Sequence, residues 1–183
     1  MFGNYKLNPA IINTMPAITP FIPKNILLMP NAAVQKAAQL ADCISSSLKR
    51  HAVAHCVFPY DYEHPTQVPQ IEGHDLLIVI GGDGTLLRAG HLCAPYDIPL
   101  LGVQAGRLGF LTELNEDCLE SGLTRLLSAN YRLENRMMLQ AELIENGGVQ
   151  QRWDVINETL ISRGREARPI EVRVDLNEGY MMS

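Results

Sequence analysis

Hydrophobic residues along the first 130 positions predict strands that alternate with helices. Four apolar segments have the length and composition of strands, at residues 25–29, 52–58, 75–80 and 99–103. Three further segments fit helices, at residues 32–50, 86–93 and 115–128. In the segment at 75–80 every residue after Asp75 is apolar, as expected of a central parallel strand buried on both faces. We therefore predict an α/β domain over residues 25–130, built on an open, largely parallel sheet.

Two asparagines stand where helices of this domain are expected to begin. Asn31 precedes the helix at 32–50, and Asn115 opens the helix at 115–128. An asparagine side chain can accept hydrogen bonds from the free N–H groups of a first helical turn. Both residues are therefore predicted to be N-caps.

Beyond residue 130 the pattern becomes that of antiparallel strands. Strand-like segments follow at residues 138–145, 153–162 and 170–176, with turns expected at 146–148 and 177–179. Residues 170–176 alternate apolar and charged side chains, typical of a half-exposed strand, and the last four residues start a partner strand. We predict that 131–183 form the start of an incomplete all-β domain. Residues 1–24 contain four prolines and are predicted to be a poorly ordered or surface-lying tail.

Composition places the chain among ordinary globular proteins. Of its 183 residues 46% are hydrophobic and 19% are charged, and the net charge is −5. No more than two basic residues are adjacent, which argues against a nucleic-acid partner. No segment reaches the ~18 apolar residues of a membrane span, so we expect a cytoplasmic protein with no membrane partner. The four cysteines are widely spaced and are expected to be reduced thiols rather than metal ligands.

The sequence Gly81-Gly82-Asp83-Gly84-Thr85 links the predicted central strand to a helix. Glycines at this position let the backbone approach a phosphate, and helix N-terminal N–H groups attract anions. A carboxylate beside a phosphate site repels the anion, so its presence indicates a chemical role. Asp83 either accepts a proton from an attacking hydroxyl or holds a Mg²⁺ ion that bridges phosphate oxygens. In the alternative interpretation Asp83 merely caps the helix at Thr85 or Leu86.

Two further segments are candidates for the same crevice. The glycine-rich stretch 102–112 follows the next strand, so it would face the same edge of the sheet, unless it is an ordinary flexible connection. Asn157 and Glu158 interrupt an apolar segment, and together they offer donors and acceptors for ribose hydroxyls. A solvated Asn-Glu pair at a strand edge is the alternative.

Taken in order, these segments resemble the NAD kinase family. The resemblance rests on Gly81–Thr85, Gly106–Thr112, Glu134–Met138 and Asn157–Glu158, and it extends from about Asn25 to the end of the chain. It implies an N-terminal α/β domain and a C-terminal all-β domain with the active site between them. It also implies that Asp83 accepts the proton of the NAD 2′-hydroxyl. The dinucleotide-contacting positions that it implies are Asp83, Gly84, Arg88, Asn157, Glu158 and Arg168.

The resemblance further implies ATP and NAD as substrates, with Mg²⁺ or another divalent cation. It leaves open whether ATP or polyphosphate is the donor and whether NAD or NADH is preferred. It implies a homo-oligomer when the protein is full length. Family members continue with an Asp-Gly segment and a Thr-Gly-Ser-Thr-like segment that this sequence lacks. We therefore expect the chain by itself to have little or no kinase activity.

Three alternatives remain at this point. Lipid kinases of the diacylglycerol or sphingosine type share the Gly-Gly-Asp-Gly-Thr turn, and sugar kinases resembling phosphofructokinase are more distant. A non-catalytic nucleotide-binding module is the alternative from another class. The segment 106–112 and the Asn157-Glu158 pair favour NAD as the acceptor.

Overall fold

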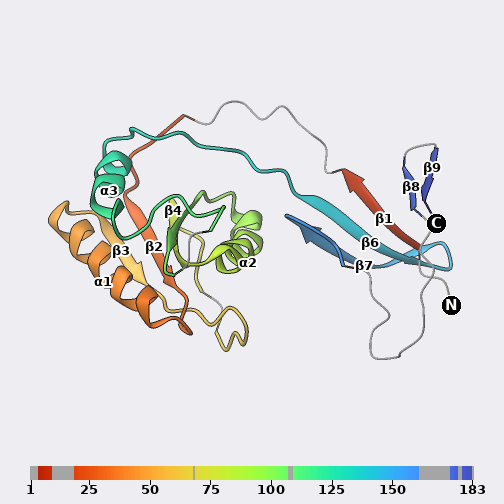
Figure 1. The fold of residues 1–183 in the computed structure, drawn as a ribbon, viewed down its shortest axis with the longest axis horizontal. Helices are drawn as coiled ribbons and strands as arrows, with labels where there is room; N and C mark the ends of the chain where they lie inside the picture. The colour runs from red at the N-terminus through yellow and green to blue at the C-terminus, as the bar shows by residue number, and fades with distance from the viewer. Residues whose placement is uncertain are drawn as a thin grey trace.

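The computed structural model describes residues 4–9, 19–67, 69–106, 109–160, 174–176 and 179–182 (Figure 1). A four-stranded parallel sheet lies at the centre of the first part, in the order β3-β2-β4-β5. Its strands are β2 (Asn25–Pro30), β3 (Ala54–Val57), β4 (Leu76–Gly81) and β5 (Leu100–Gln104). All neighbouring strands of this sheet run parallel, which confirms the predicted α/β fold.

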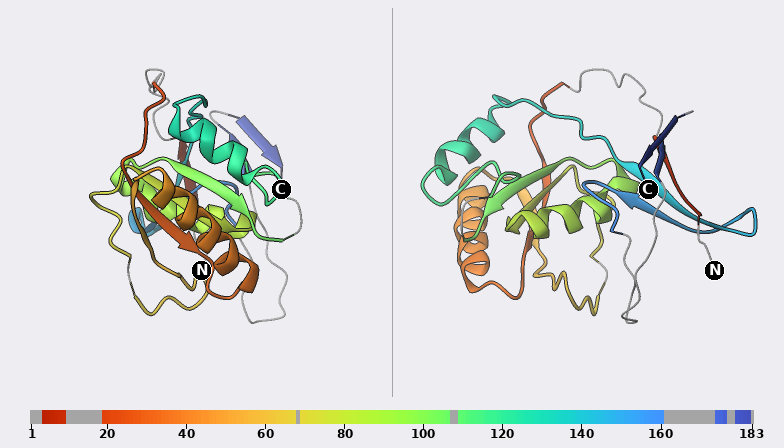
Figure 2. Two further views of the ribbon diagram at one scale, coloured as in Figure 1. Left: turned by 90° about the vertical axis from the view of Figure 1, so that its left-hand side faces the viewer. Right: turned by 45° about the vertical axis from the view of Figure 1, so that its right-hand side comes forward.

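Helices cover both faces of this sheet. Helix α1 (Gln35–Arg50) and helix α3 (Leu119–Leu127) lie on one face, and α2 (Asp83–Cys93) lies on the other (Figure 2). A short 3-10 helix, η1 (Ala94–Tyr96), follows α2 directly. A hydrophobic cluster lies on each face of the sheet. Successive side chains of β2 and β4 point to opposite faces, so each of these strands contributes to both clusters. Residues 76–80, the apolar part of the strand predicted at 75–80, are buried on both faces, as predicted.

The order of the strands creates a switch point in the sheet. From β2 the chain passes through α1 to β3 on one side, whereas β4 pairs with β2 on the other side. Connections that leave two neighbouring strands in opposite directions open a crevice at the carboxyl ends of those strands. In this chain that position lies beyond Pro30 of β2 and Gly81 of β4.

A second sheet is antiparallel and has the order β1-β6-β7. Strands β6 (Leu139–Glu145) and β7 (Gly148–Val155) form a hairpin. The predicted turn is present: Asn146 and Gly147 have φ of 53° and 79°, which suits a two-residue hairpin loop. Polar residues of β6 and β7 share one face of this sheet, where the Nε of Arg152 donates to Oε1 of Glu142 at 2.8 Å.

The edge strand β1 (Asn4–Pro9) corrects part of the sequence interpretation. We expected a tail over residues 1–24, but residues 4–9 pair antiparallel with β6. Pro9 is the last residue of an edge strand, a position where a missing N–H is tolerated. The prolines therefore led to the prediction of a tail, although they do not prevent a strand from forming at residues 4–9.

Other boundaries also differ from the sequence prediction. Helix α1 begins at Gln35 and α3 at Leu119, because the asparagines hold the preceding turns: Asn31 Oδ1 accepts from Ala33 N and Asn115 Oδ1 from Cys118 N. Helix α2 begins at Asp83 rather than at residue 86. Strand β7 ends at Val155, so the pair at 157–158 follows the strand. Of the strand predicted at 170–176, residues 170–173 lie outside the described residues, and the rest is β8 (Val174–Leu176), which pairs with β9 (Gly179–Met182).

The segment that leads into β2 and the segment that leaves α3 lie side by side. The hydroxyl of Tyr131 donates to the carbonyl of Phe21 at 2.6 Å and accepts from the Phe21 N–H at 3.0 Å. The two rings also meet edge to face. These contacts between Phe21 and Tyr131 join the two segments that connect the parallel and antiparallel sheets.

Candidate functional site

The turn after β4 depends on its glycines. Gly82 is the N-cap of α2 in extended backbone conformation, and the hydrogen bonds of the first turn run from Thr85 N and Leu86 N to Gly82 O. A Cβ on Gly81 would lie 2.6 Å from Oγ1 of Thr85, closer than a real side chain permits. The N–H groups of Asp83 and Gly84 have no acceptor within the helix, as expected at a helix N-terminus.

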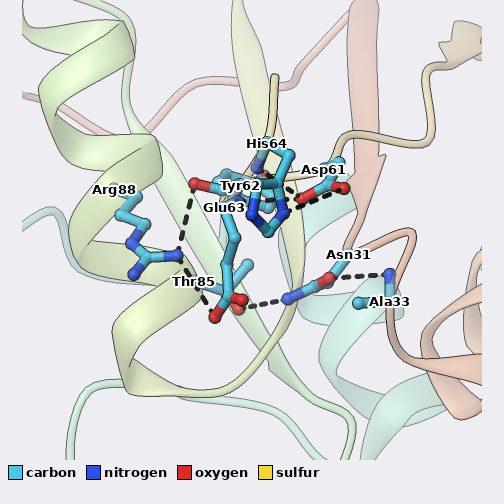
Figure 3. A network of polar contacts seen from close by, with 8 residues as sticks. All are labelled: Asn31, Ala33, Asp61, Tyr62, Glu63, His64, Thr85 and Arg88. Atoms are coloured by element: carbon cyan, nitrogen blue, oxygen red, sulfur yellow. Dashed lines mark hydrogen bonds and ion pairs between the residues drawn. The ribbon is translucent and has the colours of Figure 1, made fainter. Parts of the chain in front are cut away.

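A hydrogen bond spans the switch point. Nδ2 of Asn31, just beyond β2, donates to Oγ1 of Thr85 in the first turn of α2 at 2.9 Å (Figure 3). Thr85 is buried, so this bond ties the end of one strand to the turn that follows its neighbour. Asn31 therefore helps to fix the position of α2 over the crevice.

Asp83 is held by the second glycine-rich segment. Its Oδ2 accepts the N–H of Phe110 at 2.9 Å and its Oδ1 accepts the N–H of Leu111 at 3.0 Å. Gly109 makes this approach possible, since a Cβ there would lie 2.8 Å from the carboxylate carbon. The interpretation of Asp83 as a helix cap is wrong: Gly82 occupies the cap position and α2 has no side-chain cap.

These two hydrogen bonds fix the orientation of the Asp83 carboxylate and leave it able to accept further hydrogen bonds. An ionised carboxylate has about four acceptor positions, and the two backbone N–H groups occupy two of them. Asp83 is half-buried at the carboxyl edge of the sheet. It can accept a further hydrogen from a hydroxyl group, which is the geometric requirement for a general base.

The other predicted residues of α2 lie on its exposed side. Gly84 is exposed, with open space where a Cβ would stand. Arg88 donates from Nη1 to the carbonyl of Tyr62 at 3.2 Å and lies 3.7 Å from Oε1 of Glu63 (Figure 3). Arg88 thus supports the loop after β3 rather than contacting Asp83.

That loop is shaped by Asp61. Oδ1 of Asp61 accepts the N–H groups of His64 and Glu63, each at 2.9 Å. These bonds hold the pKa of the Asp61 carboxyl below its usual range. Tyr62 is buried beneath the loop, and desolvation raises the pKa of its phenol, which therefore stays neutral.

The pair Asn157 and Glu158 is exposed, directly after β7. Its position relative to α2 is set by the preceding residue: Cδ1 of Ile156 lies 2.7 Å from where a Cβ of Gly90 would stand. Ile156 thus fills a notch in α2, about two helical turns from Asp83. The structure brings 157–158 to the same helix as Asp83, although no direct contact joins them. Arg168 lies outside the described residues.

Sequence reasoning missed three polar residues near the crevice. Asn31 was predicted to cap the helix at 32–50, whose N-cap in the structure is Val34, and neither Gln104 nor Lys36 was considered. Gln104 ends an apolar strand and is buried, and its Oε1 accepts the hydroxyl of Thr112 at 2.7 Å. A polar residue at the carboxyl end of a central parallel strand is a signal that could have identified it.

Within the part of the chain that the structure describes, no group of three or more His, Cys, Asp or Glu residues is arranged to hold a metal ion. Mg²⁺ in phosphoryl-transfer sites is usually held by one or two carboxylates and by substrate phosphates. Asp83 has acceptor positions that remain unused, so it fits that role.

Cys93 is a buried core residue, and its burial raises the pKa of the thiol to about 12.

None of the described helices combines the length and apolar character required to cross a bilayer.

Comparison with known proteins gives a consistent answer. A model of the ATP-NAD kinase N-terminal domain matches residues 25–131. The NAD kinase of Heliobacterium modesticaldum is 43% identical over 104 residues, which are 57% of this chain and 37% of that protein. The NAD kinase of Symbiobacterium thermophilum is 42% identical over 104 residues, with the same two shares. The NAD kinase of Nitrosomonas europaea is 38% identical over 109 residues, 60% of this chain and 37% of that protein.

The match thus spans little more than a third of each relative. Among solved structures, yeast NADH kinase complexed with NADH aligns with a TM-score of 0.46 and 14% identity, over 73% of this chain and 46% of that chain. That structural similarity is too distant to inform the site.

Proposed function

This chain belongs to the NAD kinase family, and from that premise we propose that it carries the α/β part of an enzyme that phosphorylates the adenosine ribose 2′-hydroxyl of NAD. The observation that carries the proposal is the carboxylate of Asp83. It stands at the carboxyl edge of the sheet, beside the switch point, and is oriented by two backbone N–H groups. Residues 25–130 are proposed as one domain and 131–183 as the start of a second.

In the proposed reaction the oxygen of the 2′-hydroxyl attacks the terminal phosphorus of ATP, and Asp83 accepts the proton of that hydroxyl. The bond from that phosphorus to the bridging oxygen breaks, and ADP leaves with the bonding electrons. The N–H groups at the start of α2 stabilise negative charge on the phosphates. A divalent cation such as Mg²⁺, bound with the phosphates, would supply further charge neutralisation.

Asn157 and Glu158 are proposed to bind the ribose hydroxyls of NAD, because their exposed side chains follow a segment packed on α2. Gly84, Arg88 and Arg168 are proposed as further dinucleotide contacts. For Arg88 this requires that a ligand phosphate compete with the exposed Glu63 carboxylate, a weak partner in water. Cytoplasmic location and homo-oligomerisation remain predictions. The matched relatives give no support to a lipid kinase.

Asp83→Asn tests the proposal when its turnover is measured in a version of the protein that extends over the whole length of the matched relatives. The amide keeps the size of the side chain but cannot accept a proton, so kcat for NADP formation should fall by about 10²- to 10⁴-fold. The midpoint of thermal unfolding should still rise on addition of NAD, because binding does not require the base. Asp97→Asn makes the same chemical change at an exposed position outside the proposed site and serves as the control. Unchanged turnover in Asp83→Asn, or no response of the wild-type chain to NAD, NADP or ATP, would contradict the proposal.

A further inference from the structure

Cys56 lies at the edge of the parallel sheet, where its thiol meets a histidine. It belongs to β3, which stands at one end of the sheet and has no strand paired to its outer side among the described residues (Figure 1). Cys56 is exposed, and its Sγ lies 3.3 Å from Nε2 of His74. His74 is in the turn that precedes β4, whereas Asp83 follows the other end of that strand. The fold thus brings a nucleophile and a base together outside the proposed kinase site.

The second nitrogen of the His74 ring decides the direction of its hydrogen bond with Cys56. Nδ1 lies 3.1 Å from the carbonyl oxygen of Ile71, and a carbonyl can only accept, so Nδ1 carries the hydrogen. In the neutral ring Nε2 is then the acceptor, and the thiol donates its hydrogen to it. A nucleophile bonded to a base that a third group orients is the arrangement by which histidine activates a thiol.

The other groups around this pair are apolar, already engaged or directed elsewhere. Leu27 of β2 lies opposite the thiol in the strand register. His55 bonds on the other face of the sheet, to a serine of α1. The Asp75 carboxylate accepts two backbone N–H groups, and Glu72 is exposed to solvent. His74 is therefore the group placed to take the proton of the thiol.

The Cys56 thiol benefits from such a base. Its partial burial raises the pKa of the thiol, so little thiolate forms near neutral pH without help. The imidazole offsets this disadvantage because it can take the proton while the sulfur attacks. There is also room for a small reaction partner. Gly73, next to His74, is exposed and has open space where a Cβ would stand.

We propose that Cys56 is a site of thiol–disulfide exchange with low-molecular-weight disulfides, and that His74 is its base. In this reaction the sulfur of Cys56 attacks one sulfur of the small disulfide, and a new S–S bond forms. The original S–S bond breaks, and the second sulfur leaves with the bonding electrons and takes up the proton held by His74. The protein thiol is oxidised, and half of the small disulfide is reduced to a thiol. The product is a mixed disulfide at the edge of the sheet.

The rate at each cysteine can be measured with hydroxyethyl disulfide, an uncharged probe, in excess over the reduced chain. The reaction is stopped with acid, the remaining thiols are alkylated, and tryptic peptides are weighed by mass spectrometry. The four cysteines fall in four different peptides, because Lys or Arg residues separate them. Cys43 is the internal control, since it is exposed on α1 and has no imidazole partner within the described residues. Cys56 should react at least about tenfold faster than Cys43 at pH 7.

His74→Asn removes the base and should lower the rate at Cys56 at least about tenfold at pH 7, with the rate at Cys43 unchanged. Between pH 7 and 9 the remaining rate should rise by roughly several tens of fold, in step with the thiolate, because the pKa of the Cys56 thiol is raised. The wild-type rate should rise less steeply. If His74 merely tethered its turn to β3, the two pH profiles would have the same shape.

His51→Asn is the matched control, because His51 is exposed at the C-cap of α1 and should leave every rate unchanged. Cys93 reports on folding in the same digest, since it is buried and should stay unmodified in a folded variant.

Two results would overturn the inference: Cys56 that reacts no faster than Cys43 in the wild-type chain, or a folded His74→Asn variant with the wild-type rate and pH profile. Neither readout involves kinase activity, so the inference stands or fails independently of the proposed function.

Discussion

The two sheets of this protein bury their side chains to very different degrees. Every residue of β4 in the parallel sheet is buried, whereas β7 in the antiparallel sheet buries only Val155. The turn that carries Asp83 therefore emerges from a rigid core, and its position is set by that core. The segment that carries Asn157 and Glu158 emerges from a largely exposed strand. Its position depends on the contact between Ile156 and α2.

The largest expected contrast is between two valines. Val79 in β4 is 1% exposed and Val149 in β7 is 43% exposed. Val79→Ala removes buried apolar surface and leaves a cavity, so the free energy of unfolding should fall by about 2–3 kcal/mol. Val149→Ala should change it by less than about 0.5 kcal/mol. Urea unfolding followed by far-UV circular dichroism measures both.

The chain also contains a probe for the antiparallel sheet alone. Trp153, its single tryptophan, lies in β7, so tryptophan fluorescence reports on that sheet while the dichroism signal reports mainly on the helices. If the sheets unfold separately, Val79→Ala should move the dichroism midpoint and leave the fluorescence midpoint in place. Similar losses of stability for the two valine variants would contradict the difference in burial.

A second comparison concerns how Asp83 is held. An added Cβ at Gly109 would displace the carboxylate from the N–H groups of Phe110 and Leu111. Gly109→Ala should therefore lower the free energy of unfolding by about 1–2 kcal/mol. In an Asp83→Ala background the carboxylate is gone, and the same change should have little effect. A double-mutant cycle by urea unfolding should give a coupling of about 1 kcal/mol.

Gly84→Ala provides the control for this cycle, because it adds a methyl group to the same turn in open space. Its effect should be neutral or stabilising by up to about 1 kcal/mol, as alanine favours a helix over glycine. Equal effects of Gly109→Ala in both backgrounds would show that Asp83 is not held in this way.

The sequence was most informative where burial alone decides the structure. The apolar run at 76–80 identified the central strand, because a strand that is apolar throughout must be covered on both faces of its sheet. Strand β1 was missed because it is stabilised by pairing with β6, which lies about 130 positions away and leaves no local signal.

The site residues show the same difference between features with a local sequence signal and features that depend on distant contacts. Asp83 was found because a carboxylate in a glycine-rich turn is unusual by itself. Its contacts with residues 110 and 111 could not be predicted, because they depend on how two loops meet in space. The same is true of Asn31, whose bond to Thr85 crosses the switch point, and of Gln104, whose Oε1 accepts the hydroxyl of Thr112.

The smallest expected effect tests how the antiparallel part is joined to α2. Alanine is favoured over glycine inside a helix by up to about 1 kcal/mol, so Gly90→Ala should stabilise α2 if space allows. The Cδ1 atom of Ile156 occupies that space, and Ile156→Val removes it. We expect Gly90→Ala to add about 0.5–1 kcal/mol in the Ile156→Val background and almost nothing in the wild type. Urea unfolding followed by dichroism gives the stability of α2, and Trp153 fluorescence follows the antiparallel sheet in the same samples. If Gly90→Ala stabilises both backgrounds equally, Ile156 does not fill the notch, and some other contact must place Asn157 and Glu158 beside the helix that carries Asp83.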